Sequence, residues 1–68
     1  MKHAELIQTQ RMLIVARRDY VHFAMKMRYY EQRNEQPPTY LQIGIHDCER
    51  LITRLENDLI AAGVEVES

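Results

Sequence analysis

The densest group of reactive side chains in the sequence is the run His46-Asp47-Cys48-Glu49. If the chain folds back on itself, His22 lies level with this run, so imidazole, thiolate and carboxylate ligands could meet at a metal ion. The thiol could also act as a nucleophile beside a histidine base. Tetrahedral zinc needs four converging ligands and a nucleophile needs a third, positioning group. We therefore expect no metal site and no enzyme, and a metal-binding hairpin built on His22, His46 and Cys48 is only a third hypothesis.

Length and composition limit the chain to one small domain. Sixty-eight residues bury too small a core to be comfortably stable without a disulfide, a metal or a partner, and the single cysteine excludes an internal disulfide. A lone thiol fits a reducing compartment, and no apolar run approaches the roughly 18 residues that span a bilayer. No secretory signal and no glycine-rich phosphate loop occur. We expect a soluble, cytoplasmic chain that has no cofactor, stays out of the membrane and depends on a protein partner.

Helix dominates the pattern, because glycine and proline are scarce and apolar residues do not alternate with polar ones as in a strand. The break comes at Pro37 and Pro38, whose rings fix φ and remove backbone donors. Thr39 and Gln42 have the spacing of a capping box at the start of a second helix, and Gly63 can close that helix with a left-handed turn. We predict a single domain over residues 1–68, with helix one over about 4–33, a turn at 34–38, helix two over about 39–62 and a frayed tail at 63–68.

Both predicted helices carry apolar residues with coiled-coil spacing, in two sets that each repeat every seven residues. If the chain reverses near Asn34, antiparallel pairing sets large side chains opposite small ones, and the two stripes end together with Leu6 opposite Ala62. We therefore predict an all-α fold, an antiparallel two-helix hairpin that resembles a coiled coil. Its predicted core consists of Leu6, Leu13, Ala16, Tyr20, Phe23, Met27, Tyr30, Leu41, Ile45, Cys48, Ile52, Leu55 and Leu59.

A second apolar stripe lies on the first helix, where Ile7, Ile14 and Val21 repeat by seven and are joined by Met25. This stripe projects about 100° around the helix from the Leu6 stripe, so one partner helix cannot cover both. Two hairpins in a four-helix bundle, a larger helical oligomer or a neighbouring domain would cover it. We predict a non-catalytic protein–protein interaction or oligomerisation module with these four residues as its partner interface. Further apolar surface on helix two comes from Ile43, Leu51 and Ile60.

Charge is divided between the two halves of the chain. Residues 1–36 carry seven Lys and Arg against four acids, and residues 37–68 carry two against six, which favours a hairpin. The basic residues of the first helix could instead form a ridge for RNA or DNA, as in small homodimeric four-helix-bundle regulators. Asp19 and Glu31 interrupt this ridge, and Arg17 can pair with Glu49 or Glu56, so we favour pairing within the hairpin. The nucleic-acid-binding regulator is the alternative function. The ridge would contain Arg11, Arg17, Arg18, Lys26, Arg28 and Arg33.

Residues 20–63 resemble the short helical hairpins that accompany effector domains in bacterial conflict and immune-like systems. The resemblance rests on Tyr30-Glu31-Gln32, a short polar loop with Pro38, an apolar series and the closing Ala61-Ala62-Gly63. The apolar series consists of Leu41, Ile45, Ile52, Leu55 and Leu59. Asn34 is the nearest substitute for the tyrosine-glycine pair usual at the turn. Such death-like adaptor modules are fused to, or encoded beside, TIR, caspase-like and STAND NTPase proteins. The resemblance implies a module that recruits effectors or self-associates in prokaryotic defence, with no catalytic residue.

Overall fold

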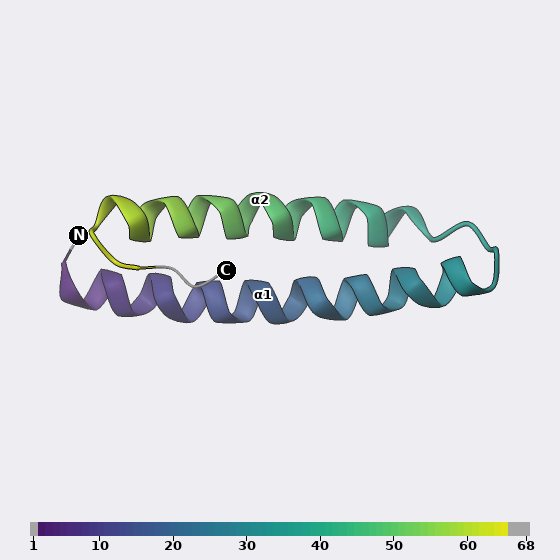
Figure 1. Ribbon diagram of the computed structural model, residues 1–68, viewed down its shortest axis with the longest axis horizontal. Helices are drawn as coiled ribbons and strands as arrows, with labels where there is room; N and C mark the ends of the chain where they lie inside the picture. Colours follow the sequence, from purple (N-terminus) through teal and green to yellow (C-terminus); the bar gives the residue numbers. More distant parts are fainter. Residues whose placement is uncertain (1, 66–68) are drawn as a thin grey trace.

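The computed structural model describes residues 2–65 and contains two antiparallel α-helices that lie side by side along the length of the shorter one (Figure 1). Helix α1 spans His3–Gln32 and helix α2 spans Thr39–Ala61, and the described residues form no strand. The molecule measures 47 × 18 × 15 Å. The predicted all-α hairpin is therefore confirmed, and the observed helix bounds differ from the predicted ones by at most one residue.

Helix α1 ends in a Schellman motif centred on Asn34, whose φ of 52° is left-handed. The Asn34 backbone N–H donates to the carbonyl oxygen of Glu31, and the Glu35 N–H donates to that of Tyr30. These two bonds satisfy carbonyls that the helix end would otherwise leave unpaired. Asparagine is the residue that most readily replaces glycine in this conformation, which explains how the turn forms without a glycine.

Helix α2 begins differently from the prediction, because Pro38 and not Thr39 occupies the N-cap position. Pro38 has φ −58° and ψ 147°, the extended geometry that an N-cap requires, so the helix starts one residue earlier than the capping box assumes. The Thr39 hydroxyl makes no capping bond, and the Gln42 side-chain amide instead donates to the Pro37 carbonyl oxygen at 3.4 Å. The predicted capping box between Thr39 and Gln42 is therefore wrong.

A second Schellman motif closes helix α2 at Gly63, which has φ 81°. The Gly63 N–H donates to the Ile60 carbonyl oxygen, and the Val64 N–H donates to that of Leu59, both at 3.0 Å. Val64 then packs against the buried side chains between the helices. The predicted left-handed closure at Gly63 is confirmed, and the tail predicted to fray is held as far as Val64. Residues 66–68 of that predicted tail lie outside the described residues.

The core is small and lies in the seam between the helices. Leu13, Ala16, Leu55 and Leu59 form one buried cluster, and Leu41 is fully buried nearer the loop. The other residues of the predicted core are half-buried in the same seam: Leu6, Tyr20, Phe23, Met27, Tyr30, Ile45, Cys48 and Ile52. Thr9, the polar member of the first stripe, is also half-buried, and its hydroxyl donates to the Glu5 carbonyl oxygen at 2.8 Å. A single hairpin therefore buries few side chains completely.

Phe23 packs directly on the backbone of α2 at Gly44. A Cβ atom placed on Gly44 would lie 2.8 Å from both Cε1 and Cζ of the Phe23 ring. The absence of a side chain at residue 44 thus makes room for the ring, although a glycine inside a helix costs about 1 kcal/mol relative to alanine.

Candidate protein-binding surfaces

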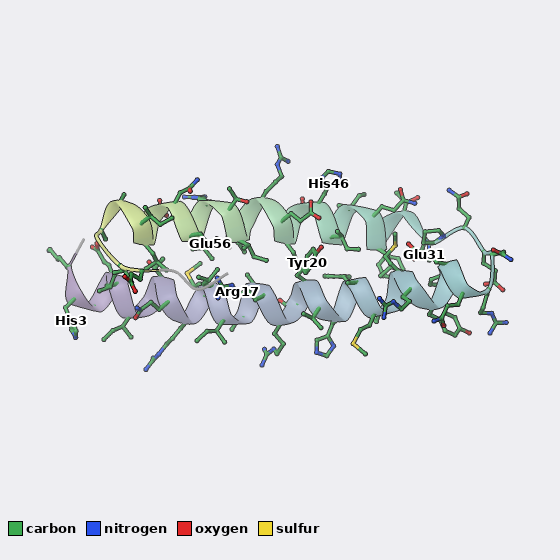
Figure 2. All side chains as sticks on the ribbon, viewed as in Figure 1. His3, Arg17, Tyr20, Glu31, His46 and Glu56 are labelled. Atoms are coloured by element: carbon green, nitrogen blue, oxygen red, sulfur yellow. The ribbon has the colours of Figure 1, made fainter. Side chains whose placement is uncertain are left out.

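The reactive run around Cys48 is spread over different faces of α2. Cys48 lies half-buried in the seam, whereas His46, Asp47 and Glu49 are exposed. In Figure 2 the His46 side chain points away from α1. Within residues 2–65, no three histidine, cysteine, aspartate or glutamate side chains lie close enough together to hold a metal ion. The geometry therefore gives no support to a metal-binding hairpin.

Burial, together with the negative charges of Asp19 and Asp47, raises the pKa of the Cys48 thiol. We predict that Cys48 reacts more slowly with iodoacetamide at neutral pH than a free cysteine does, because less of it is thiolate. Asp19→Asn with Asp47→Asn should move the pH–rate curve to lower pH, and Glu49→Gln is the matched control. An unchanged curve in the double variant would contradict the electrostatic part of this explanation.

The predicted partner interface on α1 is exposed. Ile14 and Met25 are 66% and 68% exposed, and Val21 and Ile7 are also open to solvent. We call these four residues the outer stripe. They occupy heptad positions of α1 outside the seam, and Ile14 also lines a hollow of about 290 Å³ with Leu59 and Val64. The hairpin itself therefore leaves this apolar row uncovered.

Some basic residues of α1 lie on a face of the helix that carries no acidic residue. Arg11, Arg18 and Arg28 share the outward positions with the outer stripe, and no acidic residue occupies those positions. The three acidic residues of α1, at 5, 19 and 31, fall on heptad positions that flank the seam. Asp19 and Glu31, which were expected to interrupt a basic ridge, therefore lie beside the seam, and they leave the outward positions of α1 without an acidic residue.

Arg17 lies on the flank of the seam and reaches across to α2 (Figure 2). Its Nη2 atom is 3.8 Å from Oε1 of Glu56, which is one of the two partners expected for it. An exposed pair of this kind stabilises by only about 0.2 to 1 kcal/mol, so it guides the pairing of the helices more than it holds them together.

A second apolar surface lies on one side of the hairpin, where side chains of both helices meet. Met12 and Val15 of α1 and Leu51 of α2 are exposed there, around a groove of about 440 Å³. We call this surface the flank groove, and its lining is completed by Gln8, Arg11, Ala16 and Asp19. Sequence reasoning included Leu51 as extra apolar surface but missed Met12 and Val15. Their spacing of three residues, beside the core stripe, was the available signal.

Another hollow, of about 650 Å³, lies along the outer face of α2 and is lined by Glu49, Arg50, Thr53, Arg54, Asn57 and Asp58. It is larger than the flank groove, but all its lining residues are polar and come from one helix. A partner gains more free energy from covering apolar surface, so we regard the flank groove and the outer stripe as the candidate binding surfaces.

Among the described residues, no helix is both long enough and apolar enough to cross a membrane. No protein-family model matches the chain, and neither a curated protein nor a solved structure matches it.

Proposed function

We propose that the chain is a non-catalytic protein–protein interaction module that self-associates or docks on a matching helical hairpin through the outer stripe of α1. The observation that carries this proposal is the exposure of Ile7, Ile14, Val21 and Met25 along one face of a helix whose opposite face is already packed. A row of this kind is the usual means by which one amphipathic helix binds another. A four-helix bundle made from two hairpins is the simplest assembly that covers it.

The size of the core supports the same proposal. Within residues 2–65, five apolar residues are buried, and the two most deeply buried of them are Leu41 at 0% and Leu59 at 2% exposed. A domain of about 70 residues seldom obtains more than roughly 3 to 5 kcal/mol from its own core. Covering the outer stripe would add apolar burial at about 25 cal/mol per Å², so association and folding stabilise each other.

We predict that Ile14→Glu weakens association at least about tenfold, because the interface would then bury a charged carboxylate in place of an apolar side chain. The measurement is sedimentation velocity over a wide range of chain concentrations, with helicity followed by circular dichroism. Ile43→Glu is the matched control, since Ile43 is 55% exposed on α2, away from the outer stripe. The proposal fails for self-association if the folded wild-type chain stays monomeric throughout, or if Ile14→Glu and Ile43→Glu associate equally well.

A second candidate function is a small regulator that binds RNA or DNA. It is favoured by one observation, the outward row of Arg11, Arg18 and Arg28 without a carboxylate among them. A gel shift of RNA that weakens with salt and disappears in the double variant Arg11→Glu with Arg18→Glu would support this function. An interaction module for proteins would show no such shift.

The proposed biological context is the recruitment of effector domains in prokaryotic defence. Its support is the resemblance of residues 20–63 to effector-associated helical hairpins, including the polar turn before Pro38 and the closing Ala61-Ala62-Gly63. The decisive observation is gene context: an adjoining TIR, caspase-like or STAND NTPase domain would support it. Genes of unrelated metabolism on both sides would count against it.

A further inference from the structure

The flank groove differs from the outer stripe in its charges. The outward positions of α1 carry arginines and no acid, so the outer stripe offers no carboxylate to pair with the arginines of a second copy. The flank groove is lined by one cation, Arg11, and one anion, Asp19, with Val15 between them. Within residues 2–65, neither Arg11 nor Asp19 forms an ion pair. The groove therefore has charges of both signs that are available to a partner.

The spacing of these three residues is symmetrical. Arg11, Val15 and Asp19 are separated by four residues each, so they form one ridge on α1, with a charge about 6 Å to either side of Val15. If a second α1 packs antiparallel on this ridge, with a twofold axis at Val15, residue 11 of each copy faces residue 19 of the other. Val15 then meets its own counterpart. An isologous interface requires this kind of self-complementary surface.

We propose that the flank groove is the binding site for a second copy of this chain, arranged about a twofold axis at Val15, with Arg11 of each copy paired to Asp19 of the other. Met12 and Leu51, which are exposed beside Val15, supply the apolar centre. This assignment uses a surface different from the outer stripe and does not depend on it. A chain that uses both surfaces would build assemblies larger than a dimer.

The dimensions of the hairpin are adequate for such a dimer. The hairpin measures 47 × 18 Å across one of its long faces. The area of such a face is comparable with the roughly 800 Å² that each partner buries in a standard stable interface. The arrangement also stacks α1 on α1 and α2 on α2, which makes a four-helix bundle from two hairpins. Val15, which is 45% exposed in the single hairpin, would be buried at the centre of this bundle.

Charge reversal tests the pairing, with sedimentation velocity and circular dichroism as readouts. Arg11→Asp leaves two acids on each ridge, and Asp19→Arg leaves two arginines, so each variant alone should dimerise at least about tenfold more weakly through the groove. An equimolar mixture of the two should form a one-to-one heterodimer with an affinity within about threefold of wild type. Arg50→Asp, at an exposed residue on the polar outer face of α2 that does not line the groove, is the matched control and should dimerise as wild type does.

The results separate this proposal from the one for the outer stripe. Weak self-association of each single variant and recovery in the mixture support the groove, whatever Ile14→Glu does. Wild-type association by all three charge variants overturns the groove proposal, and if Ile14→Glu still abolishes association, the outer stripe stands alone. Loss of association in both single variants without recovery in the mixture also overturns the twofold pairing. A folded wild-type chain that is monomeric at every concentration overturns it as well.

Discussion

Replacing Leu59 by alanine is expected to unfold most of the isolated hairpin at room temperature. Leu59 is 2% exposed and packs in the cluster with Leu13, Ala16 and Leu55. Removing a buried leucine side chain costs about 2 to 5 kcal/mol, through lost burial and the cavity left behind. This range matches the roughly 3 to 5 kcal/mol that a core of this size supplies, so little free energy of unfolding would remain. Circular dichroism at increasing urea concentration measures the loss.

Leu51→Ala is the matched control, because Leu51 lies in the same helix and is 38% exposed. In the monomer its truncation should lower the free energy of unfolding by less than about 1 kcal/mol. If the two variants unfold at the same urea concentration, the buried cluster is not the main source of stability. A loss at Leu51 that grows with chain concentration would instead indicate that the flank groove is covered in a dimer.

Gly44→Leu is expected to destabilise the hairpin by about 1 to 3 kcal/mol, although leucine is the better helix former. A Cβ at residue 44 would lie 2.8 Å from the ring of Phe23, so a leucine side chain must displace the whole ring from its place on α2. The gain in helix propensity is only about 1 kcal/mol and does not offset this overpacking. Urea unfolding of the single variant measures the net effect.

The double variant Gly44→Leu with Phe23→Ala shows whether contact with the ring causes the loss. The leucine can then fill the space that the ring leaves, so the double variant should be at least about 1 kcal/mol more stable than the sum of the two single effects. Gly44→Leu combined with Leu6→Ala, at the far end of the hairpin, should be additive. If the stability losses are additive in both double variants, contact with the Phe23 ring is not the cause of the loss in Gly44→Leu.

The helices and their pairing follow from sequence patterns that act locally or with a fixed period. Pro37 and Pro38 exclude helix whatever the rest of the chain does, and the seven-residue repeat brings Leu13 and Leu55 to the seam, where the structure buries both. The outward position of Ile14 follows from the same repeat. These features depend on one helix at a time and on a single reversal, so a sequence can predict them.

The flank groove could not be found from the repeat, because it requires two helices in a known register. Met12 and Val15 lie beside the core stripe of α1, but their spacing alone does not place them next to Leu51 of α2. They become one surface only when residue 51 is set level with residues 12 to 19. The N-cap of α2 was misplaced by one residue for a different reason, since Pro38 can serve as an N-cap without a capping side chain, which leaves no polar signal in the sequence.

The contact of Phe23 with α2 shows that the heptad register does not fix which residue of the partner helix a side chain touches. The repeat sets Phe23 opposite Ile45, but its ring lies against Gly44. Which neighbour an aromatic ring contacts depends on its side-chain rotamer, and the rotamer depends on where space is available. A glycine in a helix, close in level to an aromatic residue on the partner helix, is the signal that would have indicated this contact.

The reversal at residues 33–38 brings the first and last described residues to the same end of the hairpin, far from the loop (Figure 1). A force that pulls those two ends apart would therefore separate the helices progressively from the open end. The contacts near Leu6 and Leu59 would break before those of Leu41 beside the loop. The contacts would yield one after another instead of sharing the load. Such a hairpin resists stretching weakly from its open end, and a second copy lying across the seam would act as a clamp against that opening.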